Sequence, residues 1–572
     1  MEVSEFLRTL LSKRGIDEEH RIAEFLNPDY DLHLHSPFTI FDMERAVTRL
    51  LLAIQQNERI AVYADFDCDG IPGAAVLSDF FTKIGHENFE VYLPHRDREG
   101  YGFHAEALAA LAARGVSLII TVDVGTNAAA EVEVAKKLGV DVIVTDHHEV
   151  TGVLPDCVAV LNPKLGEYPF RDLCGAAVAW KLVQAALVEG RQRGIPSFTQ
   201  VADGWEKWLL DLVAIATVAD LVPLVGENRV LAHWGLRVLR KSPRLGLQAL
   251  CNSARVKRAD ILEDDIAFSI APRINAASRM DEPDAAFRLL TTRKRDEAEK
   301  IAAHLEDLNA KRKGIVAGIV RQAKKSVKQR FSENDQVIVV GNPEWKPALL
   351  GLAANSIMEE RGGLVCVWGR DAKGRIKGSC RSDGSVSVVD CFAAADEAFV
   401  EYGGHRQSGG FTLREGSVHT LPETLAKAAA DSGAVAIEPK SFAADAILAL
   451  SEISWSLYED LSRMGPFGIG NQKPIFLVAD GIVTEVRRFG KEKNHVELML
   501  ECRKTGSRAR AFQFFRSPEQ FTLPPTQGLP VGVTASLERD SYRGGLTLRL
   551  VDVLQSNAIH SEEAQERAGM VG

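Results

Sequence analysis

Three aspartates at alternate positions, Asp65, Asp67 and Asp69, follow an apolar run in the segment AVYADFDCDG. Like charges at this spacing repel one another, and buried carboxylates must take up protons or gain a positive partner. Divalent cations remove this conflict, because carboxylate oxygens are preferred ligands of Mg²⁺ and Mn²⁺. The segment therefore predicts a metal site, with a solvated acidic turn as the alternative for any single aspartate.

More acids and two histidines follow other apolar runs. They are Asp123 in TVDVG, Asp146, His147 and His148 in VTDHH, and Asp220 in ATVADLVPL. The carboxylates are too many for one ion, so two bridged ions, Mn²⁺ or Mg²⁺, are expected. A pair of ions about 3.5–4 Å apart hydrolyses phosphoesters. Asp146 can have a structural role instead of binding metal. In an extended chain, His147 and His148 are expected to point to opposite sides, so that one binds metal and the other contacts the scissile phosphate.

These residues need a scaffold that brings distant segments to one edge. Val/Ile-rich strands, expected at RIAVYA, VSLIITVDVG and VDVIVTDHH, alternate with amphipathic helices. This alternation indicates an α/β fold with a parallel, doubly wound sheet, whose strands end together at the edge where ligands bind. The acids and histidines are therefore expected to converge.

The expected secondary structure changes twice in the rest of the chain. A long polar helix is expected from about Asp296 to Gln329, although Gly314 and Gly318 weaken it. It connects to a second, smaller α/β unit that opens near Asp335. From about Lys473 short strands dominate and predict a small β-barrel of the OB-fold type.

Composition narrows the class of protein. The 572 residues carry a net charge of −10, which argues mildly against nucleic acid, but basic runs such as RVLRKSPR and RQAKKSVKQR concentrate positive charge locally. No apolar run approaches the roughly 18 residues of a membrane span. Eight cysteines occur singly without a CxxC motif, which argues against zinc knuckles and against a disulfide framework. A reducing, cytoplasmic location is therefore expected.

In this order, DFDCDG, VDVG, TDHH and VADLVPL resemble the DHH phosphoesterase superfamily. PRINAASRM, GSCRS, EYGGHRQSGGF and MGPFGIGNQKPIF are further similar to its bacterial single-strand-specific DNA exonucleases, over about residues 35–555. The resemblance implies a DHH domain, a DHHA1 domain and a C-terminal OB-fold. It also implies 5′→3′ hydrolysis of single-stranded DNA to 5′-mononucleotides with Mn²⁺ or Mg²⁺, in DNA recombination and repair.

The resemblance also implies residue roles. The metal ligands fall on Asp65, Asp67, Asp69, Asp123, His147 and Asp220, with His148 and Asp65 as catalytic residues. The contacts to DNA and its 5′-phosphate fall on Arg96, Arg279, Ser379, Arg381 and His405. Arginine forks suit a terminal phosphate, which offers more oxygens and charge than an internal diester. Ser278, in place of glycine, and Cys380, inside GSxRS, depart from the family pattern without removing a charge.

In the expected barrel, a basic and aromatic cluster predicts a platform for a single strand. Its members are Arg487, Arg488, Phe489 and Lys491, with Phe512, Phe514 and Phe515 downstream. The resemblance implies single-stranded DNA as substrate, and a single-strand-binding protein and a RecQ-type helicase as partners. A DHH oligoribonuclease or nucleotide phosphatase, and a non-catalytic DNA-binding scaffold, are the alternatives.

The expected domains follow from these motifs. They are a helical lead-in (1–55), the DHH domain (56–285), a helical connector (286–333), the DHHA1 domain (334–435), the OB-fold (436–556) and a disordered tail (557–572).

Overall fold

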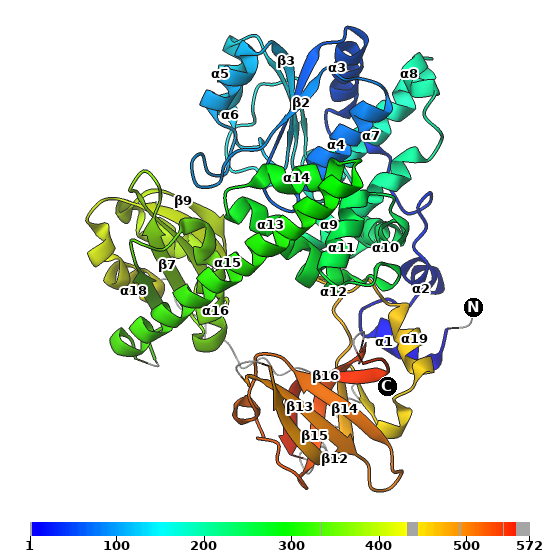
Figure 1. Ribbon diagram of the computed structural model, residues 1–572, viewed down its shortest axis with the longest axis vertical. Helices are drawn as coiled ribbons and strands as arrows, with labels where there is room; N and C mark the ends of the chain where they lie inside the picture. The colour runs from blue at the N-terminus through cyan, green and yellow to red at the C-terminus, as the bar shows by residue number, and fades with distance from the viewer. Residues whose placement is uncertain (1–2, 333, 432–443, 491–492, 541–542, 556–572) are drawn as a thin grey trace. The chain divides into compact units, whose positions relative to one another are not determined.

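The computed structural model describes residues 3–332, 334–431, 444–490, 493–540 and 543–555 (Figure 1). The chain divides into two units. The larger comprises Leu34–Val222 and Gly226–Glu438, and the smaller comprises Met1–His33, Pro223–Val225 and Pro439–Gly572. The expected tail and Lys491 lie outside the described residues.

The Val/Ile-rich segments form the central strands of a five-stranded parallel sheet. In spatial order its strands are β2 (Phe89–Tyr92), β1 (Arg59–Ala64), β3 (Val116–Val122), β4 (Asp141–Thr145) and β5 (Ala159–Leu161). The three expected strands are β1, β3 and β4, and the structure adds the two short edge strands. Nearly every residue of β1, β3 and β4 is buried, as in a sheet covered on both faces.

Helices of two kinds complete this first α/β part. The longer ones are α3 (Met43–Gln55), α4 (Gly70–Lys83), α5 (Ala105–Ala113), α6 (Ala129–Lys137), α7 (Gly175–Gln192), α9 (Leu210–Ala219), α10 (Gly226–Lys241), α11 (Leu245–Ser253), α13 (Ala271–Arg279) and α14 (Pro283–Thr291). The short ones are α8 (Pro196–Thr199), η2 (Trp205–Leu209), α12 (Glu263–Asp265) and η4 (Ile266–Ile270). Of these helices, α3, α4, α5, α6 and α7 pack against the sheet. Because α9 is apolar on every side, it is buried on every side, and it packs against α4, α7 and α10.

The expected connector is one unbroken helix, α15 (Arg295–Arg330), of 36 residues (Figure 1). Its length is about 54 Å at 1.5 Å per residue. Gly314 and Gly318 do not interrupt it, and they face open space. The first half packs against α11 and α13, whereas the second half shares a core with β6 (Val337–Gly341) and α16 (Pro347–Arg361). The helix thus ties the two α/β parts of the larger unit together.

The second α/β part is a mixed sheet. Its order is β6, β7 (Leu364–Arg370), β8 (Ile376–Ser382), β10 (Ser408–Leu413) and β9 (Phe399–His405), and only β6 and β7 are parallel. One face packs against α15 and α16. The other face packs against α17 (Val388–Ala394) and α18 (Leu421–Asp431).

The smaller unit contains the expected β-barrel. Its strands β12 (Phe476–Phe489), β13 (His495–Glu501), β14 (Arg508–Gln513), β16 (Leu546–Gln555) and β15 (Pro530–Arg539) pair in this order, and pairing of β12 with β15 closes the ring. The short strand β11 (Ala446–Leu448) pairs with β12, and α19 (Trp455–Ser462) precedes the barrel. This ring order is that of an OB-fold.

The N-terminal segment divides between the units. Helices α1 (Glu5–Ser12) and α2 (Glu19–Leu26) bury leucines in the core of the barrel unit, whereas α3 packs against α7 and β5 in the larger unit. None of the helices in the described part of the chain combines the length and apolar character that crossing a membrane requires.

Candidate active site

The turn after β1 positions the three alternating aspartates. Asp67 Oδ1 accepts the backbone N–H of Asp69 at 2.7 Å and of Gly70 at 3.2 Å, which closes the turn into α4. A Cβ at Gly70 would lie 2.3 Å from the carbonyl oxygen of Asp65, so only glycine fits. The Asp69 carboxylate accepts the N–H groups of Gly175 and Ala176 at 2.6 and 2.7 Å, where the positive N-terminus of α7 favours an anion.

The ends of β3, β4 and α9 bring further ligands to the same place. Asp123 directly follows β3 in the left-handed region, with φ 60°, and Asp220 is the C-cap of α9. His147 Nε2 lies 3.1 Å from Asp123 Oδ1, 3.6 Å from Asp220 Oδ2 and 3.7 Å from Asp69 Oδ2. The residues predicted to bind metal therefore converge. They form three groups with donor atoms within 4.8 Å of one another: Asp65 with Asp67 and Asp123, Asp69 with His147 and Asp220, and Asp123 with both histidines.

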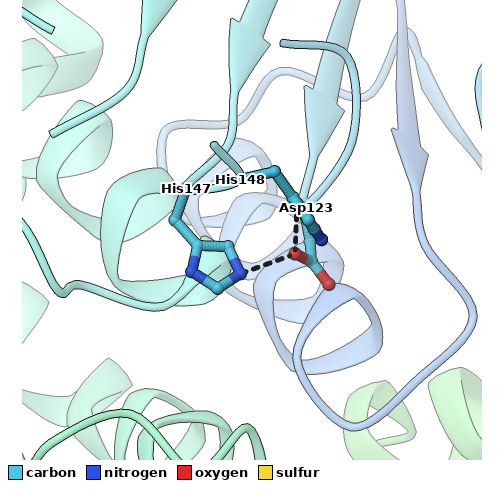
Figure 2. Close-up of side chains that lie close together, drawn as sticks. All are labelled: Asp123, His147 and His148. Atoms are coloured by element: carbon cyan, nitrogen blue, oxygen red, sulfur yellow. Dashed lines mark ion pairs between the residues drawn. The ribbon is translucent and has the colours of Figure 1, made fainter. Parts of the chain in front are cut away.

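Asp146 stands behind the histidines. Its Oδ1 lies 2.7 Å from His148 Nδ1 and accepts the backbone N–H of both His147 and His148, and its Oδ2 accepts that of Thr126. Asp146 thus orients His148, which agrees with the expectation that Asp146 is a structural residue. The expectation that the two rings point to opposite sides is wrong: both lie within 4 Å of Asp123 Oδ1 (Figure 2). The reason is that β4 ends at Thr145, and the chain then turns around the Asp146 carboxylate.

Burial and mutual repulsion disfavour ionisation of these carboxylates. Burial, followed by the charge of Asp67, raises the pKa of Asp69 to about 7 and that of Asp65 well above its usual value. Burial, followed by the charge of Asp69, raises the pKa of Asp220 to about 9. It also raises the pKa of Asp123 well above its usual value. Burial and the neighbouring His148 lower the pKa of His147 to about 4, which leaves a neutral imidazole able to bind metal.

This donor set fits divalent cations. The Oδ1 atoms of Asp65 and Asp123 are buried and accept no hydrogen bond from the described residues. Several carboxylate oxygens with one or two imidazoles suit Mn²⁺ or Mg²⁺. Cations would also remove the repulsion that raises the pKa values. The cluster has enough donors for two ions.

A group of arginines lies in the same unit. Arg279, at the end of α13, donates from Nη1 to the carbonyl oxygen of Ala348 in α16 at 2.7 Å. Burial, and then the charges of Arg96, Arg312 and Arg381, lower the pKa of Arg279 to about 9. Among the described residues, none of these four arginines has a carboxylate within ion-pair distance. We call Arg96, Arg279, Arg312 and Arg381 the arginine cluster. The charge of Asp67 offsets part of this positive charge, and the remainder favours an anion.

The remaining predicted contacts to DNA lie on the mixed sheet. Arg381 of β8 pairs with Ser408 of β10, which pairs in turn with the exposed His405 of β9. Ser379 lies two residues before Arg381, on the same side of β8. A Cβ on Gly351 of α16 would come within 2.9 Å of Arg381 Nη2, so the guanidinium rests against that glycine.

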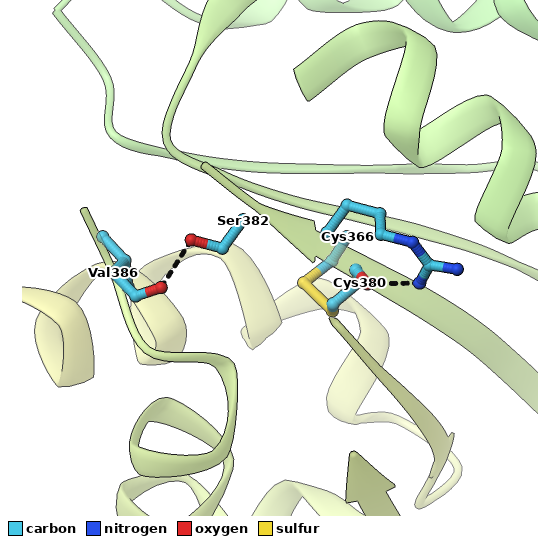
Figure 3. The surroundings of a disulfide bond; sticks show 5 residues. Cys366, Cys380, Ser382 and Val386 are labelled. Atoms are coloured by element: carbon cyan, nitrogen blue, oxygen red, sulfur yellow. Dashed lines mark hydrogen bonds between the residues drawn. A yellow bond between two sulfur atoms is a disulfide. The ribbon is translucent and has the colours of Figure 1, made fainter. Parts of the chain in front are cut away.

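A single disulfide lies next to these residues, although the scattered cysteines predict no disulfide framework. Cys366 and Cys380 are directly opposite on β7 and β8, with Cα atoms 4.2 Å apart, and form a bond (Figure 3). The 14-residue spacing does not reveal this register in the sequence. The carbonyl oxygen of Cys380 accepts Arg381 Nη1 at 2.7 Å. The bond therefore braces the strand that carries Ser379 and Arg381.

Sequence reasoning missed three neighbours of the site. The Tyr101 hydroxyl lies 3.4 Å from both ring nitrogens of His148 and 3.3 Å from the carbonyl oxygen of Asp123. Asn275 Oδ1 accepts the N–H of Cys68 at 3.0 Å and ties α13 to the aspartate turn. Arg312, on α15, joins the arginine cluster. Asn275 lies inside the motif PRINAASRM, and Tyr101 lies five residues after the predicted contact Arg96, in LPHRDREGYG. These neighbouring motif residues were the signal that could have identified both.

The predicted platform on the barrel differs from expectation in its charge. Arg488 forms an ion pair with Glu519, and Arg487 lies 3.6 Å from Glu497, so acids offset both cations. The aromatic side chains of the platform, in contrast, lie close together and are partly exposed. The Phe489 ring lies 5.1 Å from His495 and 5.8 Å from Phe514, and Phe515 is 79% exposed beside His495.

Comparison with known proteins agrees with this arrangement. Family models match residues 59–217 (DHH family, N-terminal domain), 334–431 (DHHA1 domain) and 444–552 (RecJ OB domain). The single-stranded-DNA-specific exonuclease RecJ of Bacillus subtilis is 34% identical over 507 residues, which are 87% of this chain and 62% of that protein. RecJ of Thermus thermophilus is 31% identical over 522 residues, 90% of this chain and 72% of that protein.

A solved structure extends the likeness to the fold. The crystal structure of RecJ from Thermus thermophilus in complex with Mn²⁺ aligns with a TM-score of 0.76 at 27% identity, covering 97% of this chain and 76% of that one. Its complex with Mg²⁺ aligns with a TM-score of 0.71 at 26% identity, covering 97% and 75%. The three domain matches and the extent of these similarities show that the chain belongs to the RecJ family.

Proposed function

We propose that this chain is a metal-dependent exonuclease that degrades single-stranded DNA in the 5′→3′ direction and releases 5′-mononucleotides. One observation carries the proposal: the same unit holds a buried cluster of acids and histidines and an arginine cluster that has no ion-pair partner among the described residues. The RecJ relatives are named as single-stranded-DNA-specific exonucleases, and RecJ of Thermus thermophilus forms complexes with Mn²⁺ and Mg²⁺.

The acidic cluster would hold two ions, Mn²⁺ or Mg²⁺. The ligands we propose are Asp65, Asp67, Asp69, Asp123, His147 and Asp220. When bound, such ions supply the positive charge that favours both the attack of water on a phosphodiester and the departure of its oxygen. Asp69, which the α7 N-terminus also stabilises, anchors the cluster.

The catalytic residues we propose are His148 and Asp65. Although burial opposes it, the hydrogen bond and charge of Asp146 raise the pKa of His148, which favours the imidazolium. A charged His148 can donate a hydrogen bond to an oxygen of the scissile phosphate. Asp65 would accept the proton of the attacking water, because its buried Oδ1 lies within the acidic cluster and accepts no hydrogen bond from the described residues.

The arginine cluster would account for the 5′→3′ polarity of the reaction. Arg96, Arg279 and Arg381 would bind the terminal 5′-phosphate, with Ser379 and His405 as further contacts on the mixed sheet. A terminal phosphate carries more negative charge than an internal one, so it gains most from uncompensated guanidinium groups. We further propose that Phe489 and the exposed Phe515 stack bases on the barrel.

Three further expectations from the sequence complete the proposal. The partners would be a single-strand-binding protein and a RecQ-type helicase, and the location would be the cytoplasm. The domain limits would be those expected from the motifs, with the DHH domain at 56–285, the connector at 286–333, the DHHA1 domain at 334–435 and the OB-fold at 436–556.

The experiment compares four substrates of equal length: single strands labelled at the 5′ or the 3′ end, blunt duplexes and short RNAs, each with Mn²⁺ or EDTA. We expect the 5′ label to appear at once as a mononucleotide, and the 3′ label to pass through progressively shorter fragments. Equal cleavage of duplex DNA, or activity in EDTA, would contradict the proposal. A preference for short RNA would favour the oligoribonuclease alternative.

A further inference from the structure

A cavity of about 780 Å³ lies in the larger unit, away from the acidic cluster. It is bordered by the C-terminal end of α4, the segment η2, the start of α9, the start of α11 and the end of α14. Helix α4 begins at the aspartate turn and borders this cavity at the end of its 14 residues, a length of about 20 Å. Helix α9 likewise borders the cavity at its start and ends at Asp220. The cavity is therefore at the opposite end of both helices from the predicted metal ligands.

Two indole rings give the cavity an aromatic wall. Trp205 and Trp208 both line it, and Trp208 is 49% exposed. The flat face of an exposed indole suits stacking with another aromatic ring. Lys83 lies above the Trp205 ring, with Nζ 5.8 Å from the ring centre. A cation and an aromatic ring therefore lie side by side in this wall.

The rim of the cavity is positively charged. Lys83, Lys241 and Arg293 are exposed lining residues, and none has an acidic partner within ion-pair distance among the described residues. The acids that line the cavity, Asp79 and Asp211, are both engaged by Arg244, at 2.5 and 2.9 Å. Arg244 offsets one of their two negative charges. Because the lining holds four cations (Lys83, Lys241, Arg244 and Arg293) against these two acids, its net charge within the described part of the chain is positive and favours an anion.

We propose that this cavity binds a free nucleoside phosphate. The base would stack on the indole of Trp208, and the phosphate groups would contact Lys83, Lys241 and Arg293. A volume of about 780 Å³ suits a ligand of this size. The site is separate from the proposed nuclease centre, and the inference does not depend on that activity.

The test is calorimetric titration of ADP into the whole protein in EDTA, with adenosine and ribose 5-phosphate as probes of each half of the ligand. We expect Trp208→Ala to weaken ADP binding by about tenfold or more, the scale of one lost base–aromatic stack. Lys241→Glu should weaken ADP and ribose 5-phosphate binding but leave adenosine binding unchanged. Trp455→Ala is the matched control, because Trp455 is also 49% exposed but lies on α19.

A further variant separates this site from the arginine cluster. Arg279→Gln should keep the affinity for ADP, whereas loss of binding in that variant would place the nucleotide in the proposed DNA site and overturn the inference. No ADP binding at millimolar concentration would also overturn it. So would an unchanged affinity in both cavity variants, or cavity-dependent binding of an acidic peptide in place of ADP.

Discussion

Replacing Arg279 tests how the chain would recognise a 5′ end. Its guanidinium is buried, and its pKa is lowered from 12.5 to about 9 by burial and by three neighbouring arginines. Holding the charged form there costs roughly 5 kcal/mol, because each pKa unit corresponds to about 1.4 kcal/mol. A terminal phosphate can offset part of this cost, since it supplies the negative charge that the cluster lacks.

The expected loss of kcat/KM follows from the contact to the phosphate that Arg279→Gln removes. Arg279 uses Nη1 on the carbonyl oxygen of Ala348 and retains further N–H donors for an anion. A hydrogen bond between charged groups contributes about 1.5–3 kcal/mol. Arg279→Gln should therefore lower kcat/KM on a 5′-phosphorylated single strand by roughly 10- to 150-fold. On the same strand with a 5′-hydroxyl the change should be small.

The assay measures initial rates on both strands with the wild-type protein, Arg279→Gln and the control Arg288→Gln. Arg288 is a surface arginine of α14 paired with Glu297, and its loss should leave both rates unchanged. Arg279→Gln should not lower the Tm, because it removes a destabilised buried charge. An equal loss of rate on both strands would refute phosphate recognition by Arg279.

Three other outcomes follow from the structure. Metal-free protein should lose stability as pH rises from 6 to 9, because Asp69 and Asp220 titrate with pKa values of about 7 and about 9 in the fold and about 4 when unfolded. Thermal unfolding in EDTA checks this, and a Tm that rises over the same range would contradict it. Replacing Cys366 and Cys380 together by serine should lower the unfolding free energy of the DHHA1 part by about 3 kcal/mol, the value for a closed loop of about 15 residues. Denaturant titration measures it, and an unchanged midpoint would count against a formed bond. His148→Gln should slow single-turnover cleavage about 100-fold or more with less effect on bound Mn²⁺, and a matching loss of metal would make His148 a ligand instead.

The acidic cluster could be predicted from the sequence because its signals are local. Each acid directly follows a run of buried residues, and parallel strands end at one edge, so Asp65, Asp123 and His147 had to meet. The edge strands β2 and β5 escaped prediction because they have only four and three residues. So short a segment shows no hydrophobic period.

Features that depend on register or on distant packing could not be predicted. The bond between Cys366 and Cys380 requires the pairing of β7 with β8, which spacing does not show. The positions of the His147 and His148 rings depend on a turn around Asp146 that simple strand alternation does not describe. The N-terminal helices resemble a lead-in to the first domain, yet α1 shares its core with the barrel, far along the chain.

Binding of Mn²⁺ to the acidic cluster is the most direct test of the central claim. Titration calorimetry of Mn²⁺ into the metal-free protein should show two ions per chain. More protons should be released at pH 6 than at pH 9, because Asp69 and Asp220 have raised pKa values of about 7 and about 9. Asp123→Asn should lose at least one ion and the nuclease activity. No uptake by the wild-type protein, or the same two ions in the variant, would contradict the claim.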